Sequence, residues 1–375
     1  MVDITSPFEL DSNLGIESDY FERISPVRSL DNSSGPIEFN LEPSPLHLTD
    51  LSQSYLSISV KVKRDGNAVE HCLSLTPSQI TDPSTINFSA TTGAGAPGDD
   101  TALSCVNNLM HALFSQVSLY LNNVLVERIS DYNFTSYVQT LLGFDKEAKK
   151  SAIQHLFGYY DDQPGKFQDK ANTAHRERIK HLLLNGKECH MKARLQLGVM
   201  EMGRYIPNHM SIKLVLHKKN AQFPLIFTDT STNKPDGDYS IEITDAQFEV
   251  RRLGVLPSIL KDYEAKLTRE LGQFSFVKTE CKAFTFSANQ SDITLDNIFS
   301  GDIPESILIC MLPNKTYHGD LYKNPYEFKH YDMTKAMLQA NKGIFLNELF
   351  TPLLAEKPLC GIIPCPHHQL QCCEE

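Results

Sequence analysis

The sequence predicts a mainly β protein built from two β-sandwiches. Two blocks of short segments alternate apolar and polar residues with a period of two, which is typical of strands that bury one face. A polar stretch containing STNKPDGD separates the two blocks, near residues 223–238. Hydrophobic residues make up 41% and charged residues 22% of the 375 residues, which excludes a disordered, coiled-coil or collagen-like chain.

The first block is expected at residues 36–222. Residues 1–35 precede it, lack periodicity and contain Pro7 and Pro26, so they are expected to form an extended N-terminal arm. The block opens with IEFNL, in which every second residue is apolar. The short segment Leu46-His47-Leu48 follows, and then a longer alternating strand over 55–62. Residues 64–104 are interpreted as a long excursion between strands.

The clearest local pattern is a β-hairpin in the segment QVSLYLNNVLVERI. Val117, Leu119 and Leu121 alternate with polar residues and lead into Asn122 and Asn123. Asparagine tolerates a positive φ, so the Asn pair suits a two-residue turn between two strands. The three apolar side chains are therefore predicted to face the core.

Short helices are expected at two places between the strands. Residues 131–160 carry two apolar faces interrupted at Gly143, which predicts two short helices. Another helix is expected after Pro257, through Leu260 and Leu267. Further strands are predicted at residues 189–197, 212–216, 239–250, 274–277, 284–286 and 306–309.

No catalytic or cofactor motif is present. The sequence lacks G-x-S-x-G, H-E-x-x-H and G-x-G-x-x-G, and its glycine-rich GAGAPG lacks the Gly-Lys-Ser/Thr ending of a phosphate loop. Four aromatic residues near the hairpin could stack a ligand, but core packing is the preferred interpretation for Phe114, Tyr120, Phe134 and Tyr137. We therefore predict no enzyme, with no catalytic residue, no cofactor and no metal site.

Charge and hydropathy limit the partners. The net charge is -11 and the first thirty residues hold six acids against two arginines, so direct sequence-specific nucleic-acid binding is not expected. No apolar run approaches 18 residues, which argues against a membrane helix. The N-terminus lacks the basic and apolar regions of a secretory signal, so an intracellular location, in the cytoplasm or nucleus, is expected.

The last residues, 344–375, form an atypical tail rich in proline and cysteine. Its spacing C-x4-C-x-H-H-x3-C-C could hold zinc but differs from the usual C-x2-4-C knuckles. Free thiols in an unstructured tail are the preferred interpretation, because nothing indicates an oxidising compartment. The residues concerned are Cys360, Cys365, His367, His368, Cys372 and Cys373.

Four segments carry a resemblance to a known family: GPIEF, LFSQVSLYLNN, NIFSGDIPESI and NPYEFKHYDMT, in this order between about residues 36 and 343. Together they resemble the capsid-like proteins of Maverick/Polinton DNA transposons and of adintovirus-type elements. The resemblance implies a double jelly-roll major capsid protein, in which two eight-stranded antiparallel sandwiches lie side by side. It also implies a homotrimeric capsomer, other capsid proteins of the element as partners, and a place in the virion after assembly.

The strand blocks and the resemblance together predict the domain organisation. The first jelly roll is expected at 36–222, a linker at 223–238 and the second roll at 239–343. Family members continue with further strands after the K-H-Y-D-x-T region, whereas this chain enters its atypical tail. We therefore expect an incomplete second roll, a short helix over Ile344–Leu354 and an irregular end past about residue 355.

Two other functions stay open at this point. A host-domesticated derivative would keep the fold as an interaction protein without building shells. A lectin-like ligand-binding module would need an exposed aromatic platform or a calcium-binding carboxylate cluster, and no D-x-D-x-D run is present. The oligomeric state separates these possibilities, because a shell subunit should trimerise.

Overall fold

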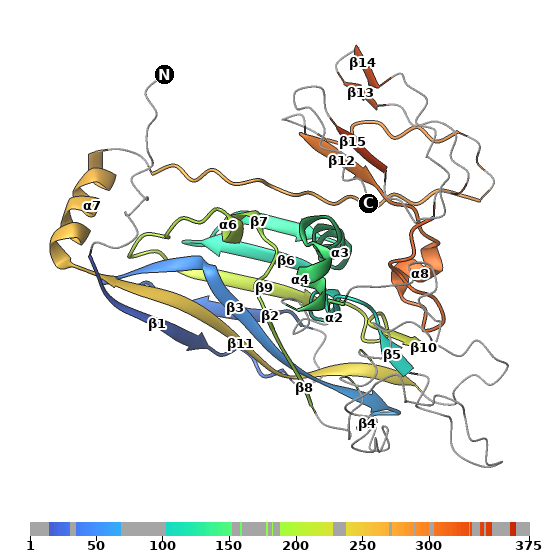
Figure 1. Cartoon of the computed structure of the whole chain (residues 1–375), viewed down its shortest axis with the longest axis horizontal. Helices are drawn as coiled ribbons and strands as arrows, with labels where there is room; N and C mark the ends of the chain where they lie inside the picture. The colour runs from blue at the N-terminus through green and yellow to red at the C-terminus, as the bar shows by residue number, and fades with distance from the viewer. Residues whose placement is uncertain are drawn as a thin grey trace.

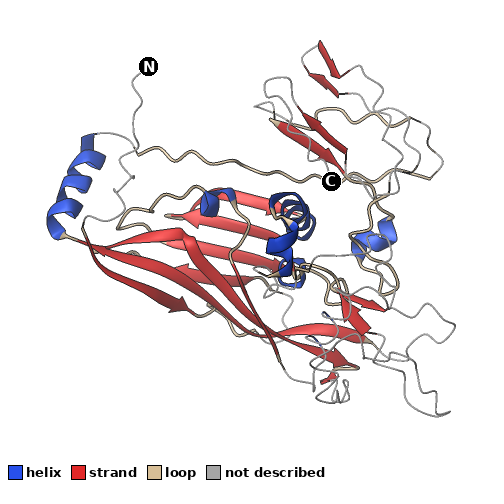
Figure 2. Cartoon of the chain, in the orientation of Figure 1, coloured by secondary structure: helices blue, strands red, loops and turns tan. Residues whose placement is uncertain are grey.

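The main body of the chain is a sandwich of two antiparallel sheets (Figure 1). The computed structural model describes residues 15–30, 35–68, 103–151, 158–159, 178, 182, 188–227, 238–269, 272–288, 290, 292–299, 304–329, 331, 338–340, 343–346 and 361–364. Strands dominate these residues, and the helices are few and short (Figure 2). The predicted mainly β fold with antiparallel sheets is confirmed.

One sheet is centred on two long strands, β3 (His47–Arg64) and β11 (Tyr239–Val255). β1 (Ile16–Ile24) pairs with the other side of β11. β8 (Cys189–Ala193) and the short β4 (Asn67–Ala68) pair with the other side of β3. All of these pairings are antiparallel.

The second sheet has the strand order β2-β9-β6-β7. β2 (Ile37–Leu41) lies at one edge, beside β9 (Ile212–Lys218). β6 (Phe114–Leu121) pairs with β9 on one side and with β7 (Val124–Ser130) on the other. β7 is therefore an edge strand within the residues that the structure describes.

The order in which the chain visits the two sheets is that of a jelly roll. The chain passes from β1 to β2 to β3, makes the hairpin β6–β7, and continues through β8 and β9 to β11. Each step except the hairpin crosses to the opposite sheet, and the first and last strands pair with each other. These eight strands form a complete jelly roll of two four-stranded sheets.

The expected boundaries of this roll are wrong at both ends. Residues 1–35 were predicted to be an arm, but Ile16–Ile24 form strand β1. Tyr239–Val255 were predicted to open the second roll, but they pair with His47–Arg64 in the centre of the first. An alternating pattern indicates a strand, yet it does not say which sheet the strand joins. The first roll therefore ends at Val255.

The predicted linker at 223–238 also contains structure. β10 (Leu225–Phe227) lies within it and pairs with β5 (Leu103–Cys105). All six of these residues are buried. Residues 228–237, which include the STNKPDG sequence, lie outside the described residues.

The predicted hairpin is confirmed in detail. Asn122 and Asn123 have φ values of 48° and 63°, as a two-residue turn with two left-handed positions requires. The Val117 and Leu119 side chains are fully buried, and Leu121 is 7% exposed. The backbone amide of Asn122 also donates to the carbonyl of Ser211, which ties the turn to the start of β9.

Three helices test the helix predictions. α3 (Tyr132–Gly143) and α4 (Lys146–Lys150) confirm two short helices with a break after Gly143, although residues 153–157 lie outside the described part. α7 (Pro257–Arg269) confirms the helix after Pro257. Two one-turn helices, α2 (Leu109–Ala112) and α6 (Gly198–Glu201), precede β6 and follow β8.

The core lies between the two sheets and explains why these strands form. Inward side chains from both sheets meet there, and the rings of Phe39 and Phe248 approach with centroids 6.0 Å apart. Leu56, Ile58 and Leu119 are at most 1% exposed. Each such side chain contributes about 1.5–3 kcal/mol by leaving water, so alternation along the strands is the main determinant of the fold.

The chain after α7 is organised differently. The described residues of 272–299 run as a long extended trace and contain none of the named strands, so the strands predicted at 274–277 and 284–286 are not formed as paired strands (Figure 1). α8 (Asn314–His318) follows, and β12 (Ser306–Ile309) lies just before it. In the described residues, the predicted incomplete second roll consists of two-stranded ribbons (Figure 1).

These ribbons correct two expectations about the tail. β14 (Gly343–Leu346) pairs with β13 (Leu338–Ala340), so the helix predicted from residue 344 does not start there. β15 (Gly361–Pro364) pairs with β12, so the end past residue 355 is not wholly irregular. β15 is the sequence Gly-Ile-Ile-Pro, whose β-branched pair favours a strand, with the proline at the strand end where it is tolerated.

Candidate assembly surfaces

Within the part that the structure describes, no group of three His, Cys, Asp or Glu side chains could hold a metal ion. Cys105 and Cys189 are buried free thiols, and burial raises the pKa of each to about 12. Such thiols stay protonated at neutral pH and are poor nucleophiles. The predicted Cys/His cluster of the tail lies outside the described residues.

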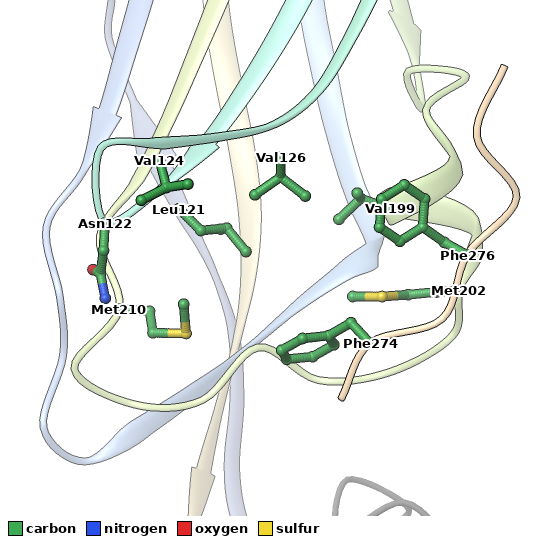
Figure 3. A pocket seen from close by; sticks show the side chains of 9 residues that line it. All are labelled: Leu121, Asn122, Val124, Val126, Val199, Met202, Met210, Phe274 and Phe276. Atoms are coloured by element: carbon green, nitrogen blue, oxygen red, sulfur yellow. The ribbon is translucent and has the colours of Figure 1, made fainter. Parts of the chain in front are cut away.

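An apolar pocket opens at the end of the sandwich where β6 turns into β7 (Figure 3). Its volume is about 350 Å³, within the range of ordinary ligand pockets. Asn122 is its one polar lining residue, and the Asn122 side-chain oxygen accepts a hydrogen bond from the Ser211 amide at 2.9 Å. The other lining residues are Leu121, Val124, Val126, Val199, Met202, Met210, Phe274 and Phe276.

One wall of the pocket comes from the extended segment formed by the described residues of 272–299, which we call the strap. Phe274 and Phe276 project from it toward the pocket, opposite Val124 and Val126 of β7 (Figure 3). The strap passes so close to the start of α6 that a Cβ on Gly198 would overlap the carbonyl oxygen of Val277. A glycine at position 198 is therefore required for the strap to lie where it does.

A buried carboxylate holds the start of α6, where the strap passes Gly198. Glu127 of β7 is 1% exposed, and its two oxygens accept hydrogen bonds from the backbone amides of Gly198 and Val199, each at 3.0 Å. Burial raises the pKa of Glu127, while these two bonds oppose the shift. The carboxylate thus links β7 to the start of α6, on which the strap rests at Gly198.

An aromatic joint connects the jelly roll to residues 304–329. The ring of Tyr137 on α3 stacks on Tyr326 with centroids 4.1 Å apart, and Phe134 stacks on Tyr317 at 5.5 Å. The Lys219 ammonium lies over three rings, those of Phe134, Phe223 and Tyr317, at 4.7–5.7 Å from their centroids. This joint fixes the C-terminal segment against the sandwich.

The aromatic set near the hairpin packs as expected at three of its four positions. Phe114 is fully buried in the main core, and Phe134 and Tyr137 pack in the aromatic joint. Tyr120 is half-buried and belongs to none of the core clusters. Their partners Tyr317 and Tyr326 are distant in sequence, so no local pattern identified the joint. The signal available was the aromatic content of the segments NKTYHG and NPYEF.

Exposed apolar side chains gather on the strap and on edge strands. Val124 at the pocket rim is 66% exposed, and β1 exposes Tyr20 and Phe21. Along the strap, Phe284, Phe286, Ile293 and Leu295 are each 42–50% exposed. Groups of exposed apolar residues mark interaction surfaces more often than isolated ones do.

Comparison with solved structures finds likenesses to viral capsid proteins. A chain of the Sputnik virophage matches with a TM-score of 0.43 and 11% identity, over 65% of this chain and 49% of that one. The mavirus major capsid protein matches with a TM-score of 0.33 and 12% identity, over 80% and 52%. The Faustovirus major capsid protein matches with a TM-score of 0.32 and 8% identity, over 67% and 56%.

The chain spans about half the length of these solved chains. No family model and no curated protein matches it. None of the helices in the described part has the length and apolar composition that a membrane crossing requires.

Proposed function

We propose that this chain is a structural, non-catalytic capsid-like subunit of a Maverick/Polinton-type element. In this proposal three copies associate into a capsomer, which joins other capsid proteins of the element in a virion shell. The observation that carries the proposal is the complete eight-stranded jelly roll, with strand orders β1-β11-β3-β8 and β2-β9-β6-β7. The segments GPIEF, LFSQVSLYLNN, NIFSGDIPESI and NPYEFKHYDMT support the family assignment.

The second β unit supports the same proposal. Residues 304–329 are held to the sandwich by the aromatic joint, and β12 to β15 extend from them as ribbons. A shell tile built from two β units presents broad side surfaces, and identical chains associate through such surfaces in closed symmetric rings. Apolar side chains exposed on β1, on the hairpin and on the strap provide contact area.

The pocket argues against the lectin-like alternative. Recognition of a sugar needs several polar groups that converge on the ligand, whereas eight of the nine residues that line this pocket are apolar. The ninth, Asn122, is engaged with Ser211. The chemistry of this pocket suits an apolar protein side chain better than a carbohydrate.

The test is the oligomeric state of the purified chain. Size-exclusion chromatography with multi-angle light scattering should give a mass of three chains, and electron microscopy should show three-lobed particles. A monodisperse monomer at all concentrations up to the solubility limit would contradict the proposal. A host-domesticated interaction protein predicts that monomer.

A further inference from the structure

The strap carries one short motif twice, ten residues apart. Phe274-Ser275-Phe276 and Phe284-Thr285-Phe286 both place two rings on alternate residues of an extended segment. Alternate side chains of extended backbone point to the same side, so each motif presents a pair of rings. The two motifs have the same spacing of aromatic side chains but different surroundings.

The first motif shows what such a pair of rings binds. Phe274 and Phe276 line the apolar pocket beside Val199 and Met202 (Figure 3). They do not fill it, since about 350 Å³ remains between them and the hairpin. Val124, 66% exposed, leaves the rim of this space accessible to solvent.

Within the residues that the structure describes, the second motif lines no pocket like that of the first. Phe284 and Phe286 are 46% and 50% exposed. The carbonyl of Val277 lies at Gly198, beside the pocket. Seven residues of extended chain from there to Phe284 span roughly 23 Å. Figure 1 shows the strap running from the α7 end, past β7 and α6, toward the C-terminal ribbons. The second motif is therefore carried away from its own pocket.

We propose that Phe284-Thr285-Phe286 of one copy docks in the apolar pocket of a second copy, beside Val124 and Val126. Phe274 and Phe276 of the first motif already pack at this pocket. The second motif has the same aromatic side chains at the same spacing, and we therefore infer that it is the occupant. The donor motif and the acceptor pocket are different surfaces of one chain, so the contact is head-to-tail and links copies into rings or open chains. This inference deepens the proposed self-assembly and rests on it.

Paired variants test the contact in the full chain. Phe284→Ser combined with Phe286→Ser removes the donor, and Val124→Lys places a charge at the acceptor rim. All three positions are exposed, so both proteins should fold. Leu46→Ser, at an apolar residue that is 59% exposed on another loop, is the matched control.

Sedimentation analysis should show self-association weakened at least tenfold in each variant but unchanged in Leu46→Ser. A 1:1 mixture of the donor and acceptor variants has one competent surface on each chain. It should form heterodimers and nothing larger. Association of both variants at wild-type strength overturns docking by this motif, while a trimer that persists would still support the shell function.

A peptide experiment separates the two proposals further. A synthetic peptide covering residues 279–289 should bind the wild-type chain and not Val124→Lys, and a peptide with both phenylalanines replaced by serine should not bind. Peptide binding can be measured by calorimetry even if the chain is monomeric. A monomeric chain that binds the peptide would contradict the shell function but not the docking contact. Absence of binding, or a small apolar molecule extracted from the pocket of the purified protein, overturns the docking inference.

Discussion

Glu127 and Val199 lie 72 residues apart in the sequence, yet the Glu127 Oε2 accepts a hydrogen bond from the Val199 backbone amide at 3.0 Å. The partner oxygen accepts from Gly198, so one buried carboxylate satisfies two amides at the start of α6. These amides have no partner inside a helix, and a carboxylate at that place also interacts favourably with the helix dipole. Glu127 thus links the edge strand β7 to α6, the helix against which the strap packs.

Replacing Glu127 with alanine should therefore destabilise the jelly roll. Two buried amides lose their acceptor, and each unsatisfied group costs about 1–3 kcal/mol. We expect a lower urea midpoint for Glu127→Ala, with little change for Glu147→Ala, whose carboxylate is exposed on α4. Equal midpoints for the two variants would show that the buried contact adds nothing to the free energy of unfolding.

Gly198→Ala tests the strap itself. The new methyl group would overlap the Val277 carbonyl, which is backbone and cannot rotate away. We expect the strap to leave the pocket, and limited proteolysis near residues 272–281 to become at least several-fold faster. Gly143→Ala is the control, because a Cβ there meets nothing within 4 Å. Unchanged cleavage in Gly198→Ala would mean that the strap does not rest on α6 in solution.

Local sequence patterns were sufficient to predict a strand where that strand has one buried and one exposed face. The β6–β7 hairpin followed from alternation and from the two asparagines, whose positive φ values the structure confirms. The break after Gly143 and the helix from Pro257 were predicted for similarly local reasons.

Local patterns failed where tertiary pairing decides the structure. β1 exposes most of its side chains on both faces, so it shows no alternation, and paired charges such as Arg251 with Asp19 hold it to β11. β11 alternates clearly, but only its pairing with β3 assigns it to the first roll. β15 was hidden in a tail whose composition favours irregular structure.

The candidate surfaces were predictable only in part. The hairpin residues of the pocket are adjacent in sequence, and the sequence located that hairpin. Phe274 and Phe276 reach the pocket through the path of the strap, which leaves no periodic signal because the segment pairs with no named strand. The joint between Tyr137 and Tyr326 likewise depends on two segments that meet only in the folded chain.

The hairpin assignment yields a substitution test of the core. Leu119→Lys would bury an ammonium group in the fully apolar interior between the sheets, and we expect a loss of at least about 3 kcal/mol or failure to fold. Val124→Lys, five residues on and exposed, should change the free energy of unfolding by less than about 0.5 kcal/mol. A Leu119→Lys protein that melts with the wild type would contradict the burial of this strand.

A buried histidine gives the fold a defined response to pH. His111 on α2 is 1% exposed, and its Nδ1 lies 2.8 Å from the Tyr132 hydroxyl. The same hydroxyl accepts a hydrogen bond from the Gln196 backbone amide at 3.0 Å. Burial lowers the pKa of His111 from 6.5 to about 4. The nearby Tyr132 has a raised pKa and stays neutral over the same range.

The sign of the effect follows from which state binds the proton. Between pH 6.5 and 4 the unfolded chain protonates this histidine while the folded chain does not, so acid favours unfolding. The stabilisation is complete above pH 6.5 and declines as the pH falls toward 4, by up to about 3 kcal/mol from this residue. In His111→Gln, which keeps a polar side chain without a titrating group, the fall over this window should be smaller by that amount. His190→Gln, at an exposed position on β8, is the matched control for the substitution itself. The measurement is the urea midpoint of each protein at half-unit pH steps. Parallel plots of midpoint against pH for wild type and His111→Gln would show that His111 is protonated in the folded chain as readily as in the unfolded one.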